Sequence, residues 1–328
     1  MKIINAQASV LVENDPIKKI EKCGRVCYKS EDKITEDSSE KFVANIIKRG
    51  HEAVLEHASF IFQLPSNVYD AYNVYEDIRN KVNFIENRYP VKMYLRLTDS
   101  EGYIVSGNVR AWRDFFQFAG VPPYMDDFVE SNPILFPEFK KVSSSSFRDW
   151  HVRQISANDL VSTYQRLVHE DISVKFICDR GVTHEIVRHR PASFCQESTR
   201  YCNYSNGKFG GEITVIKPCF FKENSTRYLN WFVACESAET AYNAILEDGG
   251  TPQEARDVLP NSLKTELIMT APLMEWCHFF NLRMSSAAHP QMREVASYAY
   301  ACVNSFLWDT HRITLDACEN VMNTMRRI

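Results

Sequence analysis

Three guanidinium groups and one imidazole lie within thirteen residues of this sequence, its densest cluster of groups able to hold phosphate. With the hydroxyl donors between them, they belong to Arg188, His189, Arg190, Ser193, Ser198, Thr199 and Arg200. Arginine suits phosphate because its planar fork donates two parallel hydrogen bonds to paired oxygens. The segment therefore predicts a site for a phosphate-bearing ligand.

Composition alone leaves two other interpretations of this segment open. A solvated basic turn, with salt bridges to nearby carboxylates, is the usual fate of a charge cluster. Binding of RNA or DNA phosphate is the second interpretation. The net charge of −4, from 38 basic and 42 acidic residues, weighs against it.

The familiar glycine-rich phosphate cradles are absent from the sequence. There is no Gly-x-Gly-x-x-Gly opening a helix and no Gly-x-x-x-x-Gly-Lys-[Ser/Thr] loop. No His-x-x-x-His pair is placed as a zinc ligand set, and Cys23-x3-Cys27 has no matching second pair, so we expect no metal. A phosphate would have to be held by side chains, which again favours the arginines.

Local patterns predict the elements that hold this segment. A helix from about Val182 should stop near Arg190, because the residue before Pro191 is steered away from helical angles. Residues 193–200 then form an extended arm that is too polar for a core. A strand at 173–178 precedes the helix.

The rest of the chain interleaves strands and helices, which indicates an α+β fold. Further strands are expected at 2–12, 58–64, 213–216 and 267–270, with a hairpin at 94–97 and 103–105. Helices are expected at 16–28, 37–49, 66–82, from Asn108, and at 225–248, 252–258, 272–283, 287–310 and 312–326.

Several local details follow from the same patterns. Asp37 and Glu40 resemble a capping box. An apolar stripe is expected on one helix at Val68, Tyr69, Tyr72 and Tyr75, and on another at Leu229, Phe232, Val233, Ala241, Ala244 and Ile245. Residues 120–156, with the serine run 143–146, are expected to form a loop.

Composition bounds the class of protein. A hydrophobic fraction of 45% and an aromatic fraction of 12% are typical of a globular protein. The sequence has no apolar run long enough for a membrane span and no signal-peptide pattern, so we expect a cytoplasmic protein with neither membrane nor nucleic-acid partners. The ten scattered cysteines are then expected to be reduced.

Residues 188–201, with the spacing Arg-His-Arg-x-x-Ser-x-x-x-x-Ser-x-Arg-Tyr, resemble the signature of the flavin-dependent thymidylate synthases. Three stretches in the same chain order are also similar to that family: 50–60 (GHEAVLEHASF), 255–260 (ARDVLP) and 278–283 (HFFNLR). The resemblance covers about 1–64 and 170–310. Residues 66–168 are therefore interpreted as an insertion in a single domain spanning 1–328.

The resemblance implies a fold, an assembly and a reaction. The fold is α+β, with a mixed or antiparallel sheet packed with long helices, and the assembly is a homotetramer with active sites between subunits. The reaction methylates dUMP to dTMP, with methylenetetrahydrofolate as carbon donor and reduced FAD as hydride donor. NADPH re-reduces the flavin.

The resemblance also implies which residues contact each ligand. The implied FAD contacts are His51, Ala53, Arg188, His189, Arg190, Gln196 and His278. The implied dUMP contacts are Glu185, Ile186, Val187, Arg188, Gln196, Glu197, Ser198, Thr199, Arg200, Arg256 and Arg283. Of these, residues 185–188 come from a different subunit.

Arg283 is implied to be the catalytic residue that activates the uracil ring. Carbon 5 of uracil becomes nucleophilic when negative charge develops through N3 and its flanking carbonyls, and a guanidinium stabilises that charge. Taken alone, Arg283 reads as a cation at a helix end. Likewise His51 alone reads as a helix cap, and His57 as a satisfied core residue.

Four positions complicate the resemblance. The family often has a small hydroxyl residue at Ala53, a carboxylate at Gln196 and an amide at Glu185, and the last two exchanges could compensate each other. Cys195 lies near arginines that could activate a thiolate, but the family needs no protein nucleophile. We therefore expect Cys195 to take no part in the chemistry.

Two other functions stay open at this point. One is a flavin enzyme of the same fold with a different nucleotide substrate. The other is a non-catalytic nucleotide- or RNA-binding protein that uses the basic 188–200 arm.

Overall fold

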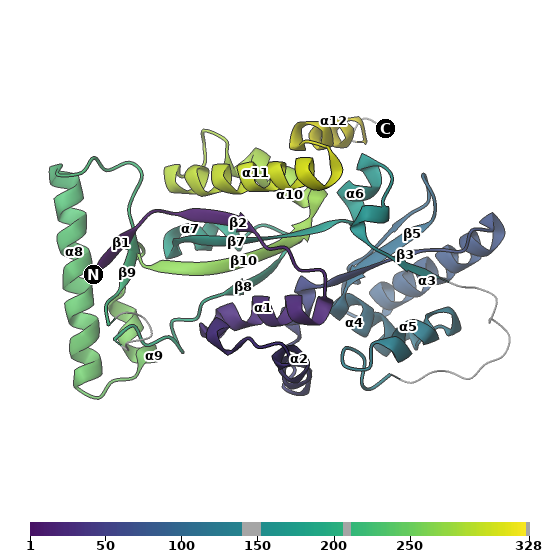
Figure 1. The fold of residues 1–328 in the computed structure, drawn as a ribbon, viewed down its shortest axis with the longest axis horizontal. Helices are drawn as coiled ribbons and strands as arrows, with labels where there is room; N and C mark the ends of the chain where they lie inside the picture. Colours follow the sequence, from purple (N-terminus) through teal and green to yellow (C-terminus); the bar gives the residue numbers. More distant parts are fainter. Residues whose placement is uncertain (140–151, 206–210, 326–328) are drawn as a thin grey trace.

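The structure, a computed structural model, describes residues 1–139, 152–205 and 211–325. Its centre is a four-stranded antiparallel sheet in the order β2-β7-β10-β8 (Figure 1). In that order the strands span Gln7–Val10, Asp171–Asp179, Lys264–Pro272 and Ser193–Gln196. Strands β7 and β10 pair along all nine residues of each, so they form the frame to which the other two strands attach.

Helices cover both faces of this central sheet (Figure 1). α10 (Leu273–Arg283), α11 (Pro290–His311) and α12 (Leu315–Met325) lie over one face. α1 (Pro16–Tyr28) lies over the other, with α2 (Ser38–Lys48) against it. Phe176, Trp276 and Phe279 pack together between β7 and α10, and this aromatic core fixes α10 on the sheet.

A second antiparallel sheet has the order β4-β5-β3-β6. Its strands are Leu95–Thr98, Ile104–Asn108, Ser59–Gln63 and Arg153–Ile155. The helices of this part are α3 (Val68–Arg88), α4 (Val109–Ala119), α5 (Asp126–Ser131) and α6 (Thr163–His169). Its core, which includes Trp112 and Phe62, also takes in Ile20 of α1 and Val43 of α2. The two parts of the chain therefore share apolar packing.

A pair of strands and a long helix form the other end of the molecule (Figure 1). β1 (Lys2–Ile4) pairs in parallel with β9 (Thr214–Ile216), next to the long helix α8 (Thr226–Glu247). The short helices are α7 (Arg180–Ile186) and α9 (Pro252–Ala255), with 3₁₀ turns at Glu31–Lys33, Glu52–His57 (η2), Pro123–Met125, Ala157–Asp159 and Arg256–Val258 (η6). Within the described ranges, no helix is long and apolar enough to cross a membrane.

Several expectations from the sequence are confirmed. The fold is α+β, and its sheets are antiparallel except for the parallel β1–β9 pair. α1 has the expected bounds, and its cap Asp15 accepts hydrogen bonds from two backbone amides. The 94–105 hairpin forms as β4 and β5. The side chain of Asn108 caps α4 by accepting a hydrogen bond from the Ala111 amide at 2.8 Å.

Two N-terminal expectations are wrong. The single strand at 2–12 is two strands, because β1 joins β9 while β2 joins the central sheet. The Asp37–Glu40 capping box does not form, because the Asp37 side chain makes no cap hydrogen bond. Ser38 bonds there instead: its hydroxyl accepts from the Thr35 amide and donates to Glu21.

Both expected apolar stripes are misplaced. α3 runs to Arg88 and buries a different set of side chains: Ala71, Val74, Ile78 and Ile85. Val68, Tyr69 and Tyr72 are exposed. α8 buries only Cys235 and Tyr242 and leaves Leu229 and Val233 exposed. Apolar character at helical spacing therefore did not identify the buried face where the helix has few neighbours.

The loop expected at 120–156 contains regular structure in its described part, namely α5 and β6 with a 3₁₀ turn at 123–125. The serine run 143–146 lies outside the described residues.

The arginine segment also differs from expectation. α7 ends at Ile186, before Arg188, because the amides of Arg188 and His189 donate to Glu185 and Ile186 in tight 3₁₀-type turns. The extended arm is not free, because its first four residues form β8 in the central sheet. A polar strand fits there because the Ser193 hydroxyl donates to the half-buried carboxylate of Glu56 at 2.8 Å.

A buried histidine ties the second sheet to α6. His169, at the end of α6, is fully buried with Nε2 2.8 Å from the Thr98 hydroxyl and Nδ1 2.8 Å from the Ser106 hydroxyl. Burial and the nearby charge of Arg96 lower the pKa of His169 to about 3. The neutral ring is therefore the folded-state form.

We predict that His169 makes stability depend on pH. Below the ordinary histidine pKa of about 6.5, the unfolded chain binds a proton that the folded chain does not. This contribution is complete above pH 6.5 and is lost, by up to about 1.4 kcal/mol per pH unit, as pH falls towards 3. Urea unfolding of wild type and His169→Gln at pH 7.5 and 5.0 measures the difference. Equal losses of stability in the two proteins would contradict the assignment.

Candidate functional site

Two of the residues expected to bind the flavin line one cavity beside α10. The cavity has a volume of about 490 Å³ and is lined by Arg190, Met274, Glu275, His278, Met322 and Met325. Arg190 and His278 were both expected at a flavin site from the sequence. The three methionines come from α10 and α12, and their flexible thioethers adapt to flat ligands.

His189 is buried next to this cavity. Its Nε2 lies 3.1 Å from the backbone oxygen of Glu275 and 3.5 Å from the Glu275 carboxylate. Its ring centroid is 5.4 Å from that of His278 and 5.4 Å from that of Phe279, on which it stands edge to face. These contacts fix His189 between α10 and the arginine turn.

The two arginines that flank His189 are exposed. Arg190 folds back on its own turn, where it donates to the backbone oxygens of Val187 at 2.5 Å and His189 at 2.8 Å. Its guanidinium carbon lies 5.1 Å from the ring centre of Phe194. Arg188 points to solvent, so both arginines have donors available to a ligand.

Arg283, at the end of α10, lies against α7. Its Nη2 donates to the backbone oxygen of Glu185 at 2.8 Å, and its Nη1 is 3.8 Å from the Glu185 carboxylate. Its Nε is buried and, within the described structure, has no hydrogen-bond partner. A buried N–H without a partner costs about 1–3 kcal/mol, so an acceptor is expected to reach it.

Hydrogen bonds to interior residues hold the chain at the end of β8 and just after it. Gln196 donates from Nε2 to the hydroxyl of Thr183 at 3.0 Å. Glu197 is buried, and its two oxygens meet Tyr204 at 2.9 Å and Lys264 at 2.9 Å. Glu197 was expected to contact dUMP, but its carboxylate anchors the loop from inside.

Ser198 to Arg200 form the turn above this anchor. The amide of Ser198 donates to Cys27, Thr199 is buried, and Arg200 is exposed. Arg200 donates from Nε to Gln253 of α9 at 3.1 Å, which places it close to the start of η6, where exposed Arg256 lies.

Two other residues expected to contact dUMP are buried or half-buried. Ile186 is fully buried in the core that includes Phe176 and Trp276. Val187 is half-buried beside it.

The 51–57 segment reaches the site through β8. His51 and Ala53 are exposed, whereas His57 is fully buried with Nδ1 2.7 Å from the Thr270 hydroxyl. Burial lowers the pKa of His57 to about 3, so it is a neutral core histidine. Glu56 does not pair with His57; its oxygens meet Ser193 and Arg110.

Cys195 is a residue of β8, and its side chain lies inside the core. Only 2% of it is exposed, and its hydrogen bond with Cys27 and its burial both raise its pKa. The thiol therefore stays protonated and out of reach of a ligand, which agrees with the expectation that it does no chemistry.

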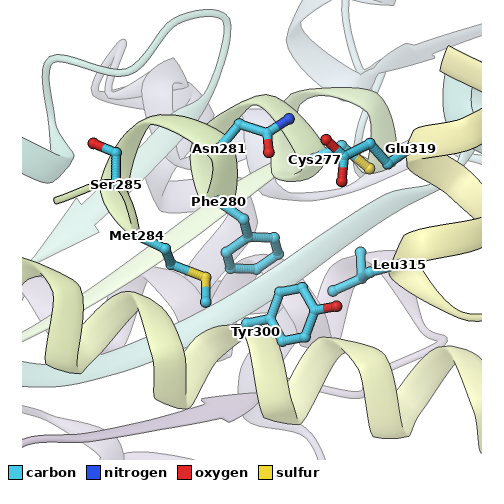
Figure 2. A pocket seen from close by; sticks show the side chains of 8 residues that line it. All are labelled: Cys277, Phe280, Asn281, Met284, Ser285, Tyr300, Leu315 and Glu319. Carbon is cyan, nitrogen blue, oxygen red and sulfur yellow. The ribbon is translucent and has the colours of Figure 1, made fainter. Parts of the chain in front are cut away.

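The opposite side of α10 borders another cavity, of about 370 Å³, which contains none of the expected site residues (Figure 2). Phe280 and Tyr300 line it with ring centroids 5.3 Å apart, and the Tyr300 hydroxyl donates to Asp316 at 2.8 Å. Helices α10 and α12 thus contribute side chains to both cavities.

The residues that sequence reasoning missed are mostly distant in the chain. Met322, Met325 and Arg110 carry no local signal that relates them to the arginine segment. Glu275 does carry one, because it lies three residues before His278 on the same helix, and such residues are neighbours on a helix surface.

Residues 9–68 and 153–307 match the sequence profile of the family described as "Thymidylate synthase complementing protein". This chain belongs to that family.

Individual relatives match a shorter part of the chain. A flavin-dependent thymidylate synthase of Pyrococcus furiosus is 35% identical over 119 residues, which is 36% of this chain and 48% of that protein. The one of Geobacter sulfurreducens is 33% identical over 117 residues, 36% of this chain and 49% of that protein. The chain spans about half the length of the curated relatives it matches.

Among solved structures, a UMP/dUMP methylase, PolB from Streptomyces cacaoi bound with 5-Br dUMP, aligns over 97% of this chain and 96% of its own. The sequence identity is 14% and the TM-score is 0.40.

We predict that Cys195 resists alkylation in the folded protein. Native protein treated with iodoacetamide should be modified first at the exposed Cys219. Modification of Cys195 should be slower by roughly a hundredfold or more, because that thiol becomes accessible only when the structure opens locally. Peptide mass spectrometry with and without denaturant measures the two rates. Equal labelling of both cysteines in native protein would show that Cys195 is accessible after all.

Proposed function

We propose that this chain is a flavin-dependent thymidylate synthase. In that reaction dUMP, methylenetetrahydrofolate, NADPH and a proton give dTMP, tetrahydrofolate and NADP⁺, with FAD as the redox cofactor. Family membership supports this proposal, as does the conjunction of four motifs in one order. The observation that carries it is the buried, unpartnered Nε of Arg283 at the end of the helix that also lines the Arg190–His278 cavity.

The residues around the cavity suit FAD. Arg190 and the neighbouring Arg188 offer forked donors to the diphosphate. His278 and the three methionines offer an imidazole and soft apolar walls to a flat ring. Their chemistry fits a cofactor that combines an aromatic ring system with negative charge.

We assign dUMP to the groups around Arg283, Gln196 and Arg200. Arg200 and Arg256, with the hydroxyl of Ser198, are the donors for its phosphate, and Glu185 lies beside Arg283 for its base. As the family resemblance implies, we propose that two copies of the chain complete each site in a homotetramer. The exposed Leu229 and Val233 of α8 are compatible with such an assembly.

Arg283 has the main chemical role in this proposal. Its guanidinium binds the uracil edge and stabilises the negative charge that develops as carbon 5 becomes a nucleophile. The Glu185 backbone oxygen holds Nη2 at 2.8 Å, which aims the free Nε at one position. Bound methylenetetrahydrofolate supplies the carbon and reduced FAD the hydride. Carbon 5 gives up its proton once the new bond has formed.

A non-catalytic nucleotide- or RNA-binding role has less support. It required a free basic arm at 188–200, but residues 193–196 are a strand of the central sheet and Glu197 is buried below the following turn. The colour of the purified protein distinguishes the two functions. A synthase binds flavin and is yellow, whereas a colourless protein that cannot be reconstituted with FAD favours the binding role.

The decisive assay is dTMP formation from dUMP, methylenetetrahydrofolate and NADPH with added FAD. We expect turnover, with tritium released from dUMP labelled at carbon 5. If flavin is bound but dUMP neither releases tritium nor becomes dTMP, the protein is a flavin enzyme with another nucleotide substrate.

We predict that Arg283→Ala loses dTMP formation by roughly a hundredfold or more, because a donor to developing charge is removed. The affinity for FAD should change by less than about twofold, since Arg283 lies outside the Arg190–His278 cavity. Cys195→Ser is the matched control and should keep near wild-type turnover. Near wild-type dTMP formation by Arg283→Ala would remove this residue from the mechanism.

A further inference from the structure

The intervening segment, residues 69–152, separates the two parts of the chain that match the family profile. Its helix α4 packs directly against η2. The amide of Val109, the first residue of α4, donates to the backbone oxygen of Ala58 at 2.8 Å. β5, just before α4, pairs along β3, just after η2. The backbone thus brings α4 to the segment that carries His51 and Ala53.

One carboxylate then links the intervening segment to the signature strand. Glu56 of η2 accepts from Nη1 of Arg110 at 2.6 Å through one oxygen and from the Ser193 hydroxyl at 2.8 Å through the other. Arg110 is on α4 and Ser193 begins β8. Both oxygens of Glu56 are therefore occupied, one by each neighbour.

A second contact of α4 supports the same element. Arg113 is almost fully buried and donates from Nη2 to Glu52 at 3.1 Å, at the first turn of η2. Arg113 is itself held by the backbone oxygen of Leu135 at 2.5 Å and by the carboxylate of Glu138. η2 is therefore tied to the intervening segment at both its ends.

The positions of these contacts relate them to the candidate cofactor site. Ser193 lies three residues after Arg190, and Phe194, next to it, carries the Arg190 guanidinium over its ring. Glu56 lies three residues after Ala53. A hydrogen-bonded carboxylate therefore joins the two chain segments that the flavin is expected to contact.

We propose that Arg110 is a positioning residue, by which the intervening segment holds the flavin-binding segments 51–53 and 190–196 in register through Glu56 and Ser193. This inference rests on the proposed function, since it needs FAD as the ligand. Arg110 itself does not line the Arg190–His278 cavity. Without the Arg110 cation, the half-buried Glu56 has no counter-charge that fixes the oxygen opposite the one bonded to Ser193. The hydrogen bond between Glu56 and Ser193 is then weakened.

The experiment measures FAD affinity in the full-length chain by quenching of flavin fluorescence. Arg110→Met should weaken FAD binding about fivefold, the order expected for members of one hydrogen-bond network. Arg110→Lys, which keeps the charge, should recover most of the loss. Arg79→Ala is the matched control, because Arg79 lies on α3 in the same segment and its ion pair within the described residues is with Glu76 on the surface. It should bind FAD like wild type.

A double-mutant cycle tests whether the effect passes through Glu56. Ser193→Ala should weaken FAD binding to a similar degree, and the double variant with Arg110→Met should be no weaker than about the worse single variant. The visible absorption band of bound flavin should shift in the same variants and stay unchanged in Arg79→Ala. If Arg110→Met folds poorly, Glu56→Gln replaces it in the cycle and should weaken FAD binding in the same way.

Each outcome has one meaning. Wild-type affinity in Arg110→Met, or independent effects of Arg110→Met and Ser193→Ala, overturns the inference and leaves the proposed function standing. A wild-type chain that binds no FAD overturns both.

Discussion

The pairing of β10 with both β7 and β8 is the constraint on which the rest of the structure depends. Thr270 of β10 lies opposite Ser173 on one side and opposite Ser193 on the other. Its hydroxyl contacts Ser173 at 2.7 Å and the buried His57 at 2.7 Å. Register between β10 and β7 is therefore fixed not only by backbone hydrogen bonds but also by side chains that cannot be paired if one strand slips by one residue. β8, the strand that follows Arg188 to Arg190, gains its position from its pairing with β10.

Charge inside the sheet makes the same register costly to change. Burial alone would raise the pKa of Glu266, but the ammonium groups of Lys264, Lys175 and Lys29 around it lower that pKa. Lys264 also holds Glu197, below the turn that carries Ser198. Buried carboxylates of this kind are stable only with their partners, so losing one lysine would leave a charge uncompensated. An ionic network thus lies below the turn that carries Ser198, whereas the Arg190–His278 cavity is lined by three methionines and an imidazole together with Arg190 and Glu275.

The sequence predicted those features that depend on a few neighbouring residues. Asn108 as a helix cap and the hairpin of β4 and β5 follow from local chemistry, and both formed. Residues 188–201 predict where a phosphate-bearing ligand binds, and this stays a prediction. The arm at 193–200 was misjudged because polarity was taken as exposure, although Ser193 is satisfied by a carboxylate more than a hundred residues away in sequence. Met322, Met325 and Arg110 could not be related to the site at all, since only the folded chain brings α12 and α4 to it.

The candidate site combines a rigid frame with an incomplete set of polar contacts. His169 and Cys195 are neutral and have hydrogen-bond partners in the core, whereas His57 bonds Thr270 through Nδ1 and, among the described residues, has no partner for its buried Nε2. Arg283 also has a buried Nε without an acceptor, while its Nη2 is already fixed. An unsatisfied donor persists only where the surrounding packing supplies the stability that it costs. The aromatic core of Phe176, Trp276 and Phe279 holds α10, the helix that ends at Arg283, in place. A donor that is fixed before the ligand arrives needs no reorganisation when charge develops next to it, and this preorganisation is what an enzyme needs to stabilise a transition state.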